Sequence, residues 1–233
     1  MVAAPAPEPA CAPASPAPGA GPAPSTPSQP ASRSGRFMGI VTLLRGRSWL
    51  GAAVAFYGLV TLFALGYALL SGRPASLVGE RWPSAALLAG GVGAGLLLVA
   101  LSHVASRVWS AAARARETLV QVIGPLGWKD ALLLALLSGI AEEVLFRGAL
   151  WPHLGLLGTS LLFGLMHMLP HRALWCYPLF ATLAGFLLGL LRSESGSVLP
   201  PILAHVTVNA INLAWMGRVA RQRQQAAAGA PGA

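Results

Sequence analysis

The chain is organised around residues 139–148, which read GIAEEVLFRG. They place Glu142, Glu143 and Arg147 inside an otherwise apolar run, residues 131–150. A charged side chain at the centre of a bilayer costs on the order of 2.5–3.5 kcal/mol on insertion scales, so this concentration of charge indicates a functional role. Glu143 and Arg147 are four residues apart and are expected to pair on one face of a helix. Glu142 is expected to point about 100° away, toward a neighbouring helix.

The composition indicates a polytopic membrane protein. Of the 233 residues, 55% are hydrophobic and only 10% are charged, whereas a soluble domain carries about 25% charged residues. The net charge of +9 does not indicate a nucleic-acid partner, because the arginines lie at the ends of apolar segments without interleaved aromatic residues. Such arginines favour loops beside the negatively charged cytoplasmic leaflet.

The alternation of apolar and polar residues predicts the domain organisation. Residues 1–35 are rich in Ala and Pro and are expected to form a disordered tail. Residues 48–110 are expected to hold two transmembrane helices, and residues 218–233 a basic, low-complexity tail. We predict an all-α polytopic membrane bundle of about six transmembrane helices, with a short interfacial helix at 117–126. The expected spans are 49–70, 84–109, 129–150, a short one from about 158–160 to 170, 173–191 and 200–216.

Three local features refine these spans. Gly91 and Gly95 in the second span are expected to allow close helix packing. Pro152, with the tryptophan before it, is expected to end the third span. Thr159 or Ser160 is expected to cap the fourth helix.

The distribution of Lys and Arg predicts that both chain termini are cytoplasmic. With six crossings, twelve of these residues lie in cytoplasmic segments and three lie outside, namely Arg73, Arg81 and Arg192. Arg147 remains within the membrane. This orientation puts Glu142 nearer the outer face.

Three further polar residues are expected to meet Glu142. At a rise of 1.5 Å per residue, His167 and Glu142 lie at similar depths, about 12–13 Å below the loop that joins their helices. His205 lies about 7 Å below the start of the last span, and Asn209 lies one turn deeper on the same face. We therefore expect Glu142, His167, His205 and Asn209 to line one polar cavity.

This set of side chains permits peptide hydrolysis. Two adjacent carboxylates in a low dielectric cannot both ionise cheaply. Arg147 would keep Glu143 charged and leave Glu142 to activate a water. A histidine and an asparagine can donate hydrogen bonds to the oxyanion that forms when water attacks a peptide carbonyl. The sequence contains no serine elbow and no His-Glu-x-x-His zinc helix.

Three ordered motifs carry a family resemblance. They are Glu142-Glu143-x-x-x-Arg147, Phe163-x-x-x-His167 and His205-x-x-x-Asn209. Their order and separation resemble the CAAX-protease and bacteriocin-processing family of intramembrane proteases. The resemblance covers the core, residues 128–217, and implies a four-helix catalytic core.

The resemblance also implies a role for each of these residues. Glu142 would be the base that activates water, and Glu143 with Arg147 would orient the site. His167, His205 and Asn209 would supply the remaining polarisation and the oxyanion contact, while Phe163 packs and places His167. No cofactor is expected. The second choice is a zinc ion held by Glu142, His167 and His205.

The implied substrate is a polypeptide with a membrane-embedded or lipid-modified end. A CAAX-like terminus, a leader peptide or a C-terminal sorting signal would qualify, and the lipid bilayer is the other partner. The expected location is the bacterial cytoplasmic membrane. Two alternatives stay open. One is a non-catalytic scaffold or a relative of the bacteriocin-immunity type. The other is a small transporter that uses the buried Glu, His and Arg groups, although we find no internal repeat of the kind that transporters show.

Overall fold

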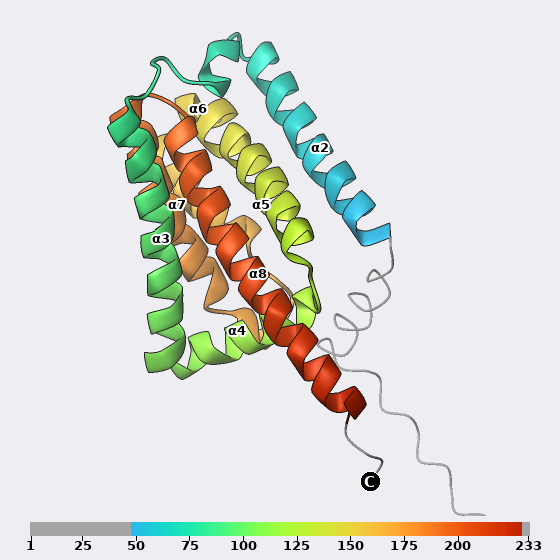
Figure 1. Cartoon of the computed structure of the whole chain (residues 1–233). Coiled ribbons are helices and arrows are strands. Elements are labelled where there is room, and N and C mark those ends of the chain that lie inside the picture. Colours follow the sequence, from blue (N-terminus) through green and yellow to red (C-terminus); the bar gives the residue numbers. More distant parts are fainter. Residues whose placement is uncertain (1–47, 230–233) are drawn as a thin grey trace, which may run out of the picture. The chain divides into compact units, whose positions relative to one another are not determined.

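The structure is a computed structural model, and it describes residues 48–229. The predicted tail at 1–35 lies outside the described residues. Seven α-helices make up most of the described chain (Figure 1): α2 (Ser48–Leu70), α3 (Ala85–Val108), α4 (Ser110–Ile123), α5 (Trp128–Glu143), α6 (Trp151–Met166), α7 (Tyr177–Ser195) and α8 (Leu199–Gly229). Three short elements join them: η1 (Pro74–Leu77), the π-helix η2 (Val144–Ala149) and η3 (Arg172–Leu174). The predicted all-α fold is confirmed.

Three segments are long and apolar enough to cross a membrane: Trp49–Leu70, Ala85–Val108 and Arg172–Ser195. Large apolar side chains on the first of them, such as Leu59 and Phe63, remain exposed. A face of this kind suits contact with lipid rather than water. The chain is therefore a membrane protein. Crossings by α5, α6 and α8 stay a prediction.

Contacts between loops show that the helices α2, α3, α7 and α8 alternate in direction. At one end, a β-bridge joins Gly79, which follows α2, to Ser197, which precedes α8. At the other end, Trp109 packs edge-on against Trp175, and Arg221 of α8 donates to the carbonyl of Leu126 at 2.5 Å. This alternation is what a bundle of antiparallel crossings requires.

Helix α8 packs closely against α3 because glycines leave room for its backbone (Figure 1). A Cβ atom on Gly91 would lie 2.5 Å from the Pro200 carbonyl oxygen, and one on Gly95 would lie 2.6 Å from that of Ala204. Side-chain atoms do not tolerate such distances, so only glycine permits this approach. The predicted close packing at Gly91 and Gly95 is confirmed.

The start of α6 differs from the prediction. Pro152 lies in the first turn of α6 instead of ending the preceding helix, because a residue without an N–H is well tolerated there. Gly155, with φ 58°, then bends the helix. The hydroxyls of Thr159 and Ser160 donate to the carbonyls of Gly155 and Leu156, each at 2.7 Å. They therefore lie inside the helix, and the predicted cap at these residues is wrong.

Two helices are longer than predicted. The interfacial helix, expected at 117–126, is α4 and begins at Ser110. The last helix, expected to end near residue 216, continues to Gly229. Contacts between the two explain the extension, because Arg223 of α8 forms an ion pair with Glu117 of α4.

Candidate active site

The two glutamates lie at the junction of an α-helix and a π-helix. Glu143 is the last residue of α5, and the wider turn of η2 begins at Val144. The Leu150 N–H donates to the Leu145 carbonyl at 2.9 Å, a bond across five residues. Such π-turns are rare and occur frequently at functional sites. Here the π-turn carries Arg147 toward α7.

Glu143, Arg147 and His205 form a network that is almost entirely closed to solvent. The Glu143 and Arg147 side chains are 0% exposed, and that of His205 is 6% exposed. One oxygen of Glu143, Oε1, accepts hydrogen bonds from Arg147 Nη1 at 3.1 Å and from His205 Nδ1 at 2.8 Å. The predicted pairing of Glu143 with Arg147 is confirmed. The pair also includes His205, which comes from α8.

Helix α7 completes this network. Arg147 Nη2 donates to the Gly185 carbonyl at 2.6 Å, and Arg192 Nε donates to the Arg147 carbonyl at 3.1 Å. The Arg147 guanidinium also lies 4.8 Å from the ring centroid of Phe163, within the range of a cation–π contact. Phe163 is buried, and its ring centroid lies 4.5 Å from that of His167, in agreement with the predicted packing role.

Glu142 and His167 form a second, partly open pair. Their side chains are 16% and 22% exposed, and Glu142 Oε2 lies 3.9 Å from His167 Nε2. His167 Nδ1 lies 2.7 Å from the Phe163 carbonyl oxygen. Because a carbonyl only accepts, Nδ1 carries the proton of this bond, and a neutral His167 presents the lone pair of Nε2 to Glu142. The distance of 3.9 Å is too long for a direct hydrogen bond.

Asn209 reaches this region indirectly. Its Nδ2 donates to the Ser138 hydroxyl at 2.9 Å. The Tyr57 side chain of α2 is an electrostatic neighbour of both Ser138 and Glu142. Asn209 therefore contacts Ser138 directly, and Tyr57 is the neighbour that Ser138 shares with Glu142.

The six predicted site residues fall into three neighbouring contacts. These are Glu143–Arg147–His205, Glu142–His167 and Asn209–Ser138. The expectation of a single set made of Glu142, His167, His205 and Asn209 needs correction, because His205 Nδ1 faces Glu143. The reason is that α8 lies against the face of α5 that carries Glu143, while the end of α6 lies beside Glu142.

The second-choice zinc set does not fit this geometry. It needs Glu142, His167 and His205 around one ion, and these three side chains do not converge on one point. Within residues 48–229, no three His, Cys, Asp or Glu side chains are arranged to hold a metal ion. We therefore derive no chemical step through a metal.

Sequence reasoning missed three residues around the site. Arg192 had been placed in an outer loop, but its side chain is buried beneath the site. Tyr57 comes from α2, far from the motifs in sequence. Tyr177 lies in the first turn of α7, with its ring centroid 5.7 Å from that of His167. The available signal was the position of Arg192 directly after the apolar run that ends at residue 191. The helix continues to Ser195 and so includes Arg192 in its last turn.

Comparison with known proteins identifies the motif-bearing part of the chain. Residues 124–211 match the family model described as type II CAAX prenyl endopeptidase Rce1-like. The chain is also 38% identical over 80 residues to the uncharacterized protein YpbD of Bacillus subtilis (strain 168). That alignment covers 34% of this chain and 42% of the relative, so the similarity spans less than half of either protein. No solved structure matches the chain.

Proposed function

We propose that this membrane protein is an intramembrane endopeptidase in which Glu142 activates the attacking water. The match of residues 124–211 to the Rce1-like family model supports this. The observation that carries the proposal is the contrast between the two adjacent glutamates. Glu143 is enclosed and bonded to two cationic or polar partners, whereas Glu142 is partly exposed beside His167. Only Glu142 is accessible to a substrate.

The geometry supports Glu142 as the general base. The Oε2 atoms of Glu142 and Glu143 are both buried and have no hydrogen-bond partner among the described residues. Of the two side chains only that of Glu142 is partly exposed, so Glu142 is the one that could accept a proton from water. The water oxygen would then bond to the carbonyl carbon of the substrate and form a tetrahedral intermediate. Glu142 would return the proton to the leaving amine as the carbon–nitrogen bond breaks.

His167 and the Asn209 region are the candidates for stabilising the oxyanion. His167 Nε2 can donate to an oxyanion only when the imidazole is protonated, because Nδ1 already carries the proton bonded to Phe163. The Tyr57 hydroxyl and the Asn209 amide are the neutral donors in the neighbourhood.

The proposed substrate is a polypeptide whose end is embedded in the membrane or carries a lipid. The candidate site lies within a bundle whose outer helices expose apolar side chains, which supports entry from the bilayer rather than from water. A CAAX-like terminus, a leader peptide and a C-terminal sorting signal all remain in this class. We place the protein in the bacterial cytoplasmic membrane with both termini cytoplasmic, on the basis of the Lys and Arg distribution.

Quantitative mass spectrometry of protein termini tests the proposal. Cells that express the wild-type protein are compared with cells that express Glu142→Gln, and with cells that express the control Glu194→Gln. Glu194 is an exposed carboxylate near the end of α7, so its loss leaves the site intact. We expect one class of uncut membrane-protein termini to accumulate with Glu142→Gln alone. Normal processing by Glu142→Gln, at a normal protein level, would contradict the general-base role and favour a non-catalytic scaffold.

A further inference from the structure

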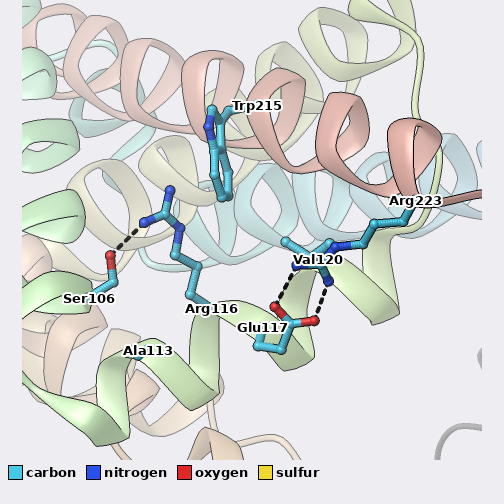
Figure 2. A pocket seen from close by; sticks show the side chains of 7 residues that line it. All are labelled: Ser106, Ala113, Arg116, Glu117, Val120, Trp215 and Arg223. Atoms are coloured by element: carbon cyan, nitrogen blue, oxygen red, sulfur yellow. Dashed lines mark hydrogen bonds and ion pairs between the residues drawn. The ribbon is translucent and has the colours of Figure 1, made fainter. Parts of the chain in front are cut away.

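A polar cavity lies at the opposite end of the bundle from the Gly79–Ser197 bridge. It has a volume of about 240 Å³ and lies between the end of α3, α4 and α8. Figure 2 shows the side chains that surround it, with Arg116 between Ser106 and Trp215, and Glu117 beside Arg223. None of these residues belongs to the candidate active site.

Arg116 is held in one orientation by two contacts. Its Nη1 atom donates to the Ser106 hydroxyl at 2.6 Å, and its guanidinium carbon lies 3.6 Å from the centroid of the Trp215 ring. Trp215 makes a cation–π contact with the guanidinium, and Ser106 accepts a hydrogen bond from one N–H. A guanidinium has five N–H donors, so four have no hydrogen-bond partner among residues 48–229 and can serve a ligand.

The positive charge of Arg116 is not balanced by the protein. Between residues 48 and 229, no carboxylate lies within ion-pair distance of it. The neighbouring Glu117 is paired instead with Arg223 through two hydrogen bonds. Burial and the nearby Arg107 cation both lower the pKa of Arg116, although an arginine stays charged at neutral pH. An anion in the cavity would relieve both the desolvation and the repulsion between the two cations.

The position of the cavity matches the depth of lipid headgroups. Helix α3 is one of the three segments able to cross a membrane, and it ends at Val108. Helix α4 then runs across the end of α3 instead of continuing it (Figure 1). A tryptophan and arginines near the end of a membrane helix are typical of the interface, where phospholipid phosphates lie.

We propose that this cavity binds a phosphate-bearing anion, with the edge of the Arg116 guanidinium as the principal donor and Ser106 and Trp215 as the groups that position it. The phosphate comes either from the headgroup of an anionic phospholipid or from free inorganic phosphate. Arginine suits this role because its planar fork donates two parallel hydrogen bonds to a phosphate. The site does not depend on the proposed peptidase activity.

Native mass spectrometry of the purified full-length protein in detergent tests this proposal. The probes are dioleoylphosphatidylglycerol, dioleoylphosphatidylcholine and inorganic phosphate. The variants are Arg116→Gln and the matched control Arg114→Gln, which removes one exposed charge from the same helix without lining the cavity. We expect the wild type to prefer phosphatidylglycerol to phosphatidylcholine. We expect Arg116→Gln to weaken phosphatidylglycerol binding about tenfold, and Arg114→Gln to change it by less than about twofold.

Competition separates the two sources of phosphate. If inorganic phosphate displaces phosphatidylglycerol from the wild type, both sources use the same groups. If it does not, the headgroup is the ligand. Equal weakening by Arg116→Gln and Arg114→Gln would overturn the proposal, because it would indicate a diffuse charge effect. So would a wild type that binds neither the anionic lipid nor phosphate selectively.

A second variant, Arg116→Lys, distinguishes a loss of binding from misfolding of Arg116→Gln. Arg116→Lys keeps the positive charge but replaces the fork by a single ammonium group. We expect it to unfold near the wild-type temperature and to bind phosphatidylglycerol more weakly than the wild type. Wild-type affinity in a folded Arg116→Lys protein would contradict the role of the guanidinium fork.

Discussion

Glu142 and Glu143 are neighbours in sequence, yet they belong to two different environments. Glu143 is fully buried with Arg147 and His205, and its partners come from η2 and α8. Glu142 is partly exposed, and its partner His167 lies 3.9 Å away at the end of α6. The two environments differ because adjacent residues of a helix point about 100° apart. One glutamate can therefore stabilise the framework of the site, while the other is the base that we propose.

The buried network holds its helices in position more than it adds net stability. Removing two charges from water costs several kcal/mol per ion, and a buried ion pair regains this only with good geometry and further hydrogen bonds. Here those bonds come from Gly185 and His205. Because the partners lie on α5, η2, α7 and α8, the network ties four elements together around Glu142.

The largest expected effect is on activity. Replacing Glu142 by Gln should reduce peptide cleavage about 10²- to 10⁴-fold, the usual contribution of a general base. The change leaves the Glu143 network intact, so the unfolding midpoint in detergent should stay close to that of the wild type. Cleavage of the substrate found by analysis of termini, measured beside thermal unfolding, checks both parts. A large loss of stability would show that Glu142 belongs to the framework after all.

Replacing Arg147 by Met should act mainly on stability. It removes one partner of a buried ion pair and leaves Glu143 buried with an uncompensated charge, which costs about 3–5 kcal/mol. Chemical denaturation in detergent measures this loss, and Glu142→Gln is its control because it alters the neighbouring carboxylate. A folding free energy equal to that of the wild type would show that the pair does not hold the helices.

A substitution at Gly139, which lies between α5 and α8, tests whether the buried network depends on the close approach of these two helices. A Cβ on Gly139 would lie 2.7 Å from Val206 Cγ2 and 3.1 Å from the Val206 backbone nitrogen. Gly139→Ala should therefore separate the two helices and cost about 1–3 kcal/mol. The control is Gly66→Ala on α2, where a Cβ meets nothing within 4 Å. Equal stability of the two variants in thermal unfolding would refute the close packing.

Tyr57 tests whether α2, which lies outside the family match, contributes to the open pair. Tyr57→Phe removes only the hydroxyl, which is an electrostatic neighbour of Glu142 and Ser138. If this hydroxyl donates a hydrogen bond to the oxyanion, cleavage should fall about tenfold, the effect of one hydrogen bond to a charged group. Tyr67→Phe, in the last turns of the same helix, is the control. If both variants cleave at the wild-type rate, the site is complete without α2.

The smallest effect concerns the exposed pair Glu117–Arg223. The hydrogen bond from Arg223 lowers the pKa of Glu117. Because the pKa is lowered in the folded state, the pair stabilises the folded protein fully at a pH above the ordinary pKa of Glu, about 4.3. This stabilisation is lost as the pH falls through the lowered pKa. Arg223→Gln should thus reduce the unfolding temperature slightly at pH 6, and the difference should shrink as the pH is lowered below the ordinary Glu value. A difference that grows on acidification would reverse this assignment.

Local features of the chain were sufficient to predict many parts of this molecule. Apolar runs predicted the helices, and the spacing of Glu143 and Arg147 predicted their pairing, because helix geometry repeats regularly along the chain. The π-turn at η2 and the bend at Gly155 were not predicted. Both depart from regular helix geometry. Residue spacing predicts which side chains share a face only where the helix stays regular. The length of α8 was missed for another reason. Residues 218–229 carry few large apolar side chains, and they are supported by contacts with α4 and with the loop that follows α4.

By itself, the sequence determined an all-α membrane protein with charged groups inside an apolar helix, because composition and periodicity act through local chemistry. The tertiary structure alone decided which partner each group meets. It assigned His205 to Glu143 and His167 to Glu142, brought Tyr57 to the site, and buried Arg192 beneath Arg147. These choices depend on how the helices rotate and approach one another, and small residues such as Gly91 and Gly95 set that approach.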